Sequence, residues 1–354
     1  MRQRQLDGVR GVAILSVFLF HHFFVSAGWM GVDLFFVLSG FLITRTLWET
    51  KHHQSYWAQF YIKRAGRILP PLIPILLLAL MLSRRVTIAG FFGYAFFLGN
   101  YMNLTRYHID VLNVLWSLAI EEHYYLLWPA VVRFLSRKQC IIVSLVIIFA
   151  EPFIRMVATP HVSEYRAIYS LTWFRLDGLA SGSLLALVLP FNQVRNWLGN
   201  IALWVSASFV VLYVFMTKIY SETFVRENNT YLFNGFGYSI VTLGCFFLVA
   251  HLVFNSEDYL SRLLSTKPLV LLGEISYSMY LLHMLTMAIL RRVFHVGVGL
   301  PSVHGTRLLF LVNFPLVICL TWLSFRFYES PILKWSRRKA RIFEHAEIED
   351  AART

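Results

Sequence analysis

Histidines and paired carboxylates stand inside two apolar stretches of the sequence, and these residue types carry proton transfer and nucleophilic chemistry. His21 and His22 follow Arg10 by about 16 Å of helix. Glu121 and Glu122 are adjacent in the segment WSLAIEEHYYLLWP. Ionisable groups at such depth are costly unless they face a water-filled cavity or one another. The pattern predicts a wet cavity, with a helix–helix hydrogen bond or a structural ion pair as the alternatives.

A basic cluster lies in the segment FYIKRAGRILPP, where Arg64 and Arg67 stand three residues apart and so share one helical face. Lys63 is adjacent to them. Two guanidinium groups on one face suit a pyrophosphate. The alternative is that these basic residues only mark the cytoplasmic side of the membrane or bind anionic lipid.

Four further polar positions interrupt later apolar stretches, and we expect them to line a pocket. Arg175 and Asp177 lie in WFRLDG, and Tyr280 and His283 share a helical face in ISYSMYLLHM. Asp33 follows a short glycine-containing turn and is expected in the same pocket, with capping of a helix N-terminus as the alternative.

The elements that position these residues are membrane helices. The chain has 354 residues, of which 57% are hydrophobic and 14% charged, with a mean hydropathy of +0.60. Such a composition cannot cover an ordinary globular surface with polar groups. The net charge of +13 arises largely from Lys and Arg in short loops, as expected beside membrane spans, so we expect no nucleic-acid partner. The three cysteines form no metal-binding pattern, and no metal is expected.

About ten transmembrane helices are predicted in a single all-α membrane domain over residues 1–333, followed by a basic-then-acidic cytoplasmic tail at 334–354. An eleventh apolar segment at 69–82 is short and contains Pro70, Pro71 and Pro74, so it is predicted to be broken or re-entrant. The basic loops then fall on one side, with both termini cytoplasmic. The predicted spans lie near 8–27, 31–49, 87–104, 113–134, 140–158, 170–190, 198–217, 231–254, 269–291 and 307–328.

Six segments of the chain resemble the membrane-bound acyltransferase family 3, whose members transfer acyl groups, commonly acetyl, to extracytoplasmic glycans. In the order of that family, these segments are LDGVRGVAILSVFLFHH, GVDLFFVLSGFLIT, FYIKRAGRILPP, WSLAIEEHYYLLWP, ISYSMYLLH and FRFYESP. They extend over nearly the whole chain. The resemblance implies an acetyl-CoA-dependent O-acetyltransferase of the bacterial cytoplasmic membrane.

The resemblance also implies roles for individual residues. The catalytic positions of the family fall on His21, Glu121 and Glu122, with His21 as base or transient acyl carrier and a carboxylate orienting it. Arg10, Arg64 and Arg67, with the adjacent Lys63, are expected to bind the phosphates of acetyl-CoA. The acceptor would be a glycan or lipid-linked glycan. Some family members carry an extracytoplasmic esterase-like domain; here such a partner would be a separate protein.

A transporter or flippase is the main alternative, because midplane ionisable groups in a helical bundle also mark substrate or proton pathways. We find no internal inverted repeat in the sequence. Basic residues expected on the cytoplasmic side and a mid-span histidine fit a nucleotide-bearing acyl donor better than a transported solute.

Overall fold

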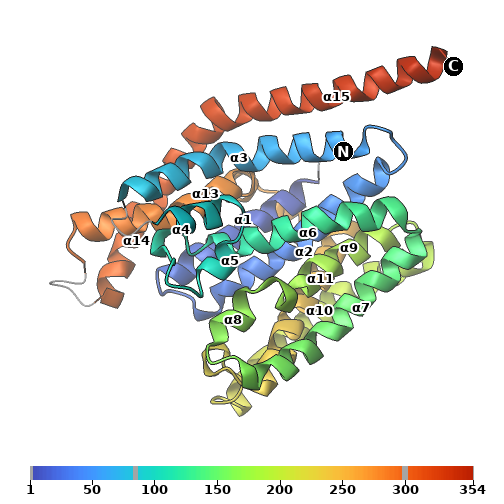
Figure 1. The fold of residues 1–354 in the computed structure, drawn as a ribbon. Helices are drawn as coiled ribbons and strands as arrows, with labels where there is room; N and C mark the ends of the chain where they lie inside the picture. The colour runs from blue at the N-terminus through green and yellow to red at the C-terminus, as the bar shows by residue number, and fades with distance from the viewer. Residues whose placement is uncertain (1–2, 83–86, 297–301, 354) are drawn as a thin grey trace.

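A computed structural model describes residues 3–82, 87–296 and 302–353, and the regular structure within these ranges is helical, without strands. The helices form an elongated bundle (Figure 1). Seven helical stretches are long and apolar enough to cross a membrane, which confirms the prediction of an all-α polytopic membrane protein. They are Ser26–Glu49, Tyr56–Leu82, Arg137–His161, Asn192–Ile219, Phe233–Phe254, Lys267–Val293 and His304–Ala340.

Three other helices belong to the bundle. α1 (Arg4–His21) and α6 (Leu115–Phe134) are 18 and 20 residues long, and they carry Arg10, His21, Glu121 and Glu122 of the predicted site. α9 (Leu176–Val188) is apolar but only 13 residues long, and it begins six residues later than the predicted span. The number of membrane crossings therefore stays a prediction.

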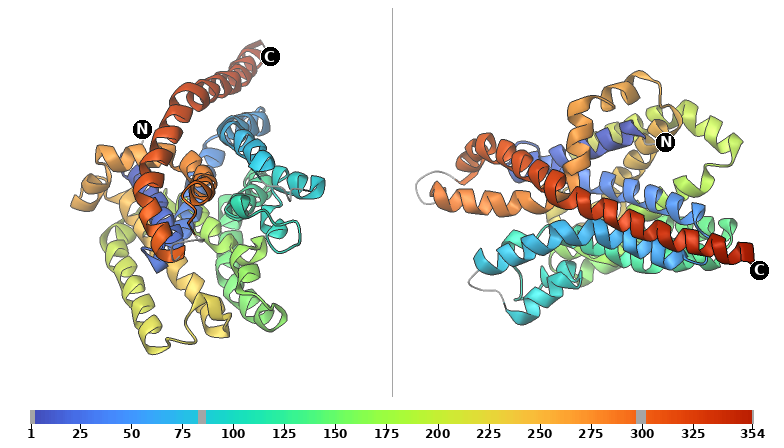
Figure 2. Two further views of the ribbon diagram at one scale, coloured as in Figure 1. Left: turned by 90° about the vertical axis from the view of Figure 1, so that its left-hand side faces the viewer. Right: turned by 90° about the horizontal axis from the view of Figure 1, so that it is seen from above.

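The prediction that the segment 69–82 is broken or re-entrant is wrong, because these residues form the second half of one continuous helix. α3 runs over Tyr56–Leu82 with Pro70, Pro71 and Pro74 inside it. Each proline removes an N–H donor, a loss that membrane helices tolerate where neighbouring helices pack against them. Such neighbours are α13 (Lys267–Val293) and α15 (Ser330–Arg353), and α15 lies along α3 (Figure 2).

The predicted span at 87–104 is also corrected. Two short helices, α4 (Ile88–Ala95) and α5 (Gly99–Met102), replace it. Phe97 between them has a φ of 59°, in the left-handed region, and this conformation ends the first helix. The apolar run therefore folds back on the bundle instead of forming a single rod.

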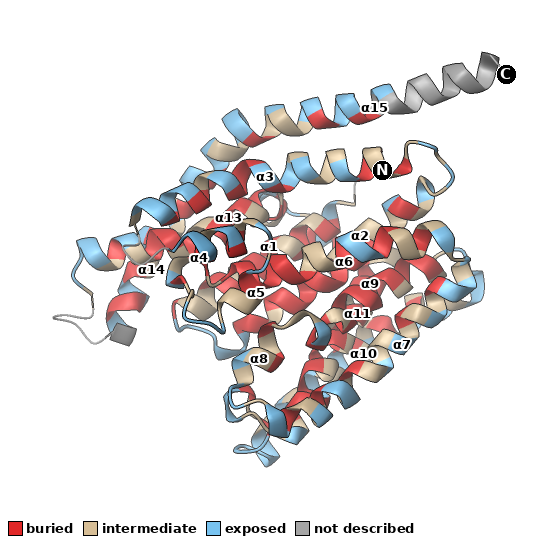
Figure 3. Cartoon of the chain, in the orientation of Figure 1, coloured by how far each residue is buried: buried red, intermediate tan, exposed pale blue. Residues whose placement is uncertain are grey.

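Two glycines stand where neighbouring helices approach too closely to leave room for a side chain. A Cβ on Gly273 of α13 would lie 1.8 Å from the carbonyl oxygen of Asp7 in α1. A Cβ on Gly182 of α9 would lie 1.9 Å from the carbonyl oxygen of Val37 in α2 (Gly31–Glu49). Small residues let membrane helices pack backbone to backbone. α1 and α2 are thereby held in the centre of the bundle, where buried residues concentrate (Figure 3).

The remaining helices complete the bundle and carry its apolar exterior. Large apolar side chains are exposed along α7 and α10, including Phe149, Val157 and Trp204. Exposed apolar surface on this scale requires lipid as its solvent. The bounds not yet given are α7 Arg137–Ala158, α8 Tyr165–Ser170, α10 Asn192–Ile219, α11 Tyr238–Phe254, α12 Tyr259–Leu264 and α14 Ser302–Ser324.

Candidate active site

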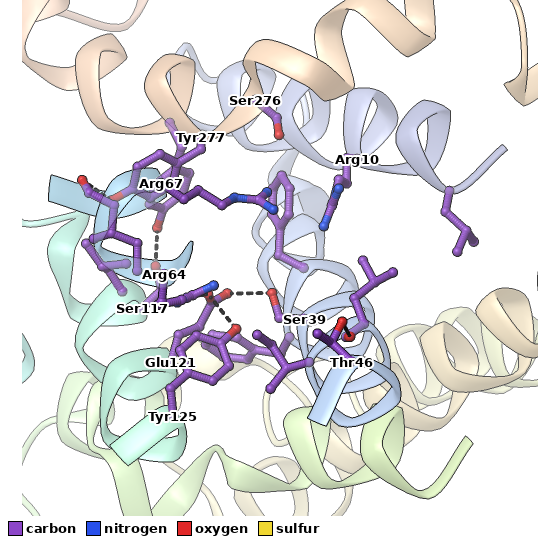
Figure 4. Close-up of a pocket in the computed structure, with 18 of the residues that line it drawn as sticks. Arg10, Ser39, Thr46, Arg64, Arg67, Ser117, Glu121, Tyr125, Ser276 and Tyr277 are labelled. Atoms are coloured by element: carbon purple, nitrogen blue, oxygen red, sulfur yellow. Dashed lines mark hydrogen bonds and ion pairs between the residues drawn. The ribbon is translucent and has the colours of Figure 1, made fainter. Parts of the chain in front are cut away.

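A cationic cavity of about 460 Å³ opens beside the first half of α1, and we call it the arginine cavity (Figure 4). α1, α2, α3, α6, α13 and α15 all contribute to its wall. Five arginines line it against two carboxylates, those of Asp7 and Glu121, so the cavity attracts anions. The arginines are Arg10, Arg45, Arg64, Arg67 and Arg337.

Arg64 is bound tightly inside this cavity. Its guanidinium group donates to Glu122 at 2.9 Å and to Glu121 at 3.3 Å. It also lies 3.7 Å from the centre of the Tyr125 ring, in a cation–π contact. Ser39 and Tyr125 donate hydrogen bonds to the two oxygens of Glu121, at 3.1 Å each. Arg64 and the two carboxylates therefore form a fixed unit in the wall.

Arg67 has a different environment, although it stands one turn further along α3. Within the described parts of the chain, no hydrogen bond or ion pair reaches its guanidinium group. Arg10, on the facing helix α1, is paired with Asp7 at 3.4 Å. Lys63 donates to Gln59 at 3.3 Å and does not line the cavity. Arg67 is thus the cation of the predicted cluster best placed to receive an anionic ligand.

A second cavity, of about 150 Å³, lies beside the other end of α1, and we call it the histidine cavity. His21 lines it. Aromatic side chains and two arginines form much of the remaining wall, among them Trp29, Trp116, Tyr169 and Arg226. Aromatic rings and hydrogen-bonding groups are the surfaces that small organic ligands use in proteins.

Arg226 is held among the rings of this cavity. The guanidinium carbon of Arg226 contacts four aromatic rings, and it lies 4.8 Å from the centre of the Tyr169 ring and 5.3 Å from the centre of the Trp29 ring. Arg226 also forms an ion pair with Glu227. Burial opposes its charge, but Tyr169 and the Glu227 carboxylate raise the pKa of Arg226. The guanidinium group therefore stays charged beside the histidine.

The structure separates the roles of the adjacent histidines. The ring of His21 faces the cavity and lies 5.0 Å from the ring of His283. His22 is buried elsewhere: Nδ1 donates to the Phe18 carbonyl at 2.8 Å, and Nε2 accepts from Asn313 at 3.2 Å. His22 therefore has a packing role, because both ring nitrogens are satisfied within the protein.

Glu121 and Glu122 lie away from His21, contrary to the expectation that one of them orients it. Both are paired with Arg64, and Glu121 lines the arginine cavity whereas His21 lines the histidine cavity. The physical reason is that buried carboxylates gain most from a guanidinium group within hydrogen-bonding distance. The neighbour of His21 is instead His283 from α13.

One wall separates the two cavities. Val32 and Tyr280 line both of them. The Tyr280 hydroxyl lies 2.7 Å from Ser117 Oγ and donates to the Val114 carbonyl at 3.1 Å. Tyr280 therefore forms part of the lining of both cavities.

Asp33, Arg175 and Asp177 line neither cavity. Asp33 pairs with Arg175 at 2.5 Å, and Asp177 pairs with Arg155 at 3.0 Å. Arg155 is fully buried and binds Glu151 as well, at 3.1 Å. Opposite charges in a low-dielectric interior satisfy one another, so these residues hold α2, α7 and α9 together.

Some of these residues were not predicted from the sequence. Glu151 and Arg155 could have been found, because opposite charges four residues apart inside an apolar run indicate a helical ion pair. Arg226 and Arg337 carry no such signal, since only the tertiary fold brings them to a cavity. Within the described residues, no group of three histidine, cysteine or acidic side chains could hold a metal ion.

These features define an integral membrane protein with two polar cavities near opposite ends of α1, one cationic and one containing a histidine. The chain belongs to the acyltransferase family whose domain model, described as an acyltransferase domain, matches residues 3–326. The family inferred from the six sequence segments is thereby confirmed.

The sequence is similar to curated bacterial proteins. It is 30% identical to the peptidoglycan O-acetyltransferase OatA of Listeria monocytogenes, over 93% of this chain and 55% of the relative. It is 27% identical to the O-acetyltransferase OatA of Staphylococcus aureus, over 93% of this chain and 57% of the relative. The chain thus spans little more than half the length of these relatives. No solved structure matches it.

Proposed function

We propose that this protein is an integral-membrane O-acetyltransferase. Acetyl-CoA binds in the arginine cavity from the cytoplasm, and a hydroxyl group of an extracytoplasmic glycan or lipid-linked glycan enters the histidine cavity. The proposal is supported above all by one observation: the two cavities lie near opposite ends of α1 and adjoin at Val32 and Tyr280. The family and the similarity to O-acetyltransferases point the same way.

The arginine cavity fits the donor by charge. Arg67, without a carboxylate partner in the described residues, and Arg10 offer guanidinium groups to the phosphates of CoA. Arg64 supports the wall through Glu121 and Glu122, which gives these predicted catalytic residues a positioning role. Gln3, just before α1, and Arg337 of α15 also line this cavity, and we place the cavity and both termini on the cytoplasmic side.

The reaction requires a group that handles the proton of the acceptor hydroxyl, and His21 is the residue we assign to it. As a base, His21 takes this proton while the hydroxyl oxygen bonds to the acetyl carbonyl carbon and the C–S bond breaks; CoA leaves as the thiolate, which the proton held by His21 converts to the thiol. As an acyl carrier, a nitrogen of His21 first bonds to the acetyl carbonyl carbon and CoA leaves as the thiolate; the acceptor hydroxyl then takes the acetyl group from His21, and its proton goes to the thiolate. Labelled acetyl-CoA without acceptor distinguishes the two, because only a carrier yields an acetylated protein.

The test is acetyl transfer by the purified protein, reconstituted in lipid and given acetyl-CoA and a cell-wall glycan preparation. His21→Ala should abolish transfer without unfolding the protein, since its ring faces a cavity. His22→Ala is the matched control: it should lower the melting temperature and leave part of the transfer activity. Full activity of His21→Ala would refute the assignment. Glycan-dependent transport without consumption of acetyl-CoA would favour a flippase.

The glycan and the cellular setting are further parts of the proposal. Peptidoglycan is the first acceptor to test, because it is the one named for the Listeria relative. We place the protein in the bacterial cytoplasmic membrane, with a separate extracytoplasmic transferase as its partner. Comparing the mass of surface glycans with and without the gene, in steps of one acetyl group, identifies the acceptor.

A further inference from the structure

The arginine cavity and the histidine cavity share part of their lining. Among the described residues, Val32 of α2 and Tyr280 of α13 are the side chains common to both linings. The Tyr280 ring is also packed against His283, with the ring centres 5.7 Å apart, and His283 lies against His21. A group that passes from the arginine cavity to His21 along this shared lining passes the Tyr280 ring.

Hydrogen bonds of the Tyr280 hydroxyl group hold this ring against the start of α6, where the two cavities adjoin. Its two hydrogen-bonding partners lie on different sides, because Ser117 lines the arginine cavity and Val114 lines the histidine cavity. With Tyr280 donating to the Val114 carbonyl, Ser117 Oγ donates to the Tyr280 hydroxyl, and Ser117 Oγ itself lies 3.3 Å from the Val114 carbonyl oxygen. The contact is a small set of neutral hydrogen bonds, which a side chain can break and remake as it changes rotamer.

We propose that Tyr280 is a specificity-determining partition, which keeps water from the donor thioester and, together with Val32, limits the transferred group to a short acyl chain. This inference rests on the proposed function. The ring turns aside when the acyl end of the donor reaches it, and the space between Tyr280 and Val32 admits acetyl. Longer chains clash with the ring, because packed interiors do not yield to an added methylene without cost.

The partition has a chemical consequence for water. If the ring is not fastened, water from the histidine cavity attacks the thioester: the water oxygen bonds to the acyl carbon, the C–S bond breaks, and acetate and CoA thiol are released. The ratio of acetyl-CoA hydrolysed to acetyl transferred therefore reports how well the partition closes.

Tyr280→Phe and Ser117→Ala test the fastening. Each removes the Tyr280–Ser117 hydrogen bond and keeps the aromatic ring, so each should raise the hydrolysis-to-transfer ratio several-fold. Tyr124→Phe is the matched control: the Tyr124 hydroxyl lies 2.6 Å from Ser183 Oγ, a similar Tyr–Ser contact, and neither residue lines either cavity. Its ratio should match that of the wild type. Equal ratios in all four proteins would overturn the proposal.

Tyr280→Ala and Val32→Ala test the limit on chain length. One methylene in an apolar pocket changes selectivity by roughly 10–200-fold. We therefore expect transfer from butyryl-CoA, relative to acetyl-CoA, to rise by about tenfold or more in Tyr280→Ala, and by less in Val32→Ala. Unchanged acyl preference in both variants would contradict the role in specificity, and a melting curve for each variant establishes that it is folded.

A labelling experiment tests the partition without any catalysis. Ser39→Cys places a thiol in the arginine cavity, in a chain whose three native cysteines are replaced by alanine. A small charged methanethiosulfonate reagent is added to either side of proteoliposomes. With Tyr280 present the thiol should react from one side only, and with Tyr280→Ala from both. Identical labelling would overturn the partition, whereas a wild-type protein that transfers no acyl group would refute only the proposed function.

Discussion

The imidazole rings of His21 and His283 lie 5.0 Å apart, with an angle of 50° between their planes, and they join the end of α1 to the middle of α13. His283 Nδ1 donates to the Tyr280 carbonyl at 2.6 Å, so in the neutral ring Nε2 is an acceptor. This Nε2 is buried and has no hydrogen-bond partner among the described residues. The pair thus places an unused acceptor beside the proposed base.

His283 is expected to position His21, and substitution should affect turnover more than binding. His283→Leu should lower kcat several-fold with little change in the KM for acetyl-CoA. His283→Asn should retain more activity, because its amide can still donate to the Tyr280 carbonyl. Steady-state kinetics of the two variants check this. If both variants lost kcat and thermal stability to the same extent, the role of His283 would be limited to packing.

Arg67 and Arg64 should respond differently to removal of their charge. Arg67→Gln removes a guanidinium group that has no carboxylate partner in the described structure, so donor affinity should fall by about tenfold or more while thermal stability is kept. Arg64→Gln leaves Glu121 and Glu122 without their cation, which should destabilise the protein by about 3–5 kcal/mol. Binding of CoA and thermal unfolding separate the two effects. A stable Arg64→Gln variant would contradict this account.

The buried Arg155 should be required for the fold and not for the chemistry. Arg155→Met leaves Glu151 and Asp177 buried without their cation, with an expected loss of about 3–5 kcal/mol. Arg45→Met provides a comparison, because the Arg45–Glu49 pair is largely exposed and should contribute about 0–1 kcal/mol. Yield of monodisperse protein and its melting temperature measure the difference. Similar melting temperatures would show that the network around Arg155 is dispensable.

Gly273 should tolerate no side chain, because of the close approach of α1 and α13. In Gly273→Ala the new methyl group would overlap the Asp7 carbonyl, so the helices must move apart and stability should fall by about 1–3 kcal/mol. Gly199→Ala is the matched control in α10, since the nearest atom lies 3.8 Å from the added Cβ. That change should be neutral or stabilising by up to about 1 kcal/mol. Equal melting temperatures would refute the packing argument.

Arg226 is expected to act on the acceptor side only. Arg226→Gln keeps a polar side chain but removes the charge beside His21, and should raise the KM for the glycan several-fold. Slow hydrolysis of acetyl-CoA in the absence of acceptor should stay as in the wild type, because Arg226 does not line the arginine cavity. A change in donor KM alone would place Arg226 outside the acceptor site.

Most of the membrane helices were predictable from apolar length alone. α2, α7, α10 and α13 lie within a few residues of their predicted spans. Two segments were predicted wrongly for local reasons. The prolines near residue 70 do not break α3, whereas the apolar run at 87–104 is interrupted by the backbone conformation at Phe97. Hydropathy measures the preference for lipid, and it carries little information about a single residue in a left-handed conformation.

The sequence by itself determined the class of the protein, its family and the chemical character of the site. It identified His21 as an ionisable residue that hydrocarbon does not accept without a cavity or partners, and Arg64 and Arg67 as two cations on one helical face that suit a pyrophosphate. Only the tertiary structure decided how these groups are distributed. In the folded chain, Glu121 and Glu122 form ion pairs with Arg64 from a helix far away in the sequence. His21 lies beside His283, and Tyr280 lies between the two cavities. The physical reason is that the partner of a buried charge is selected by the packing of whole helices, which local spacing along the chain does not specify.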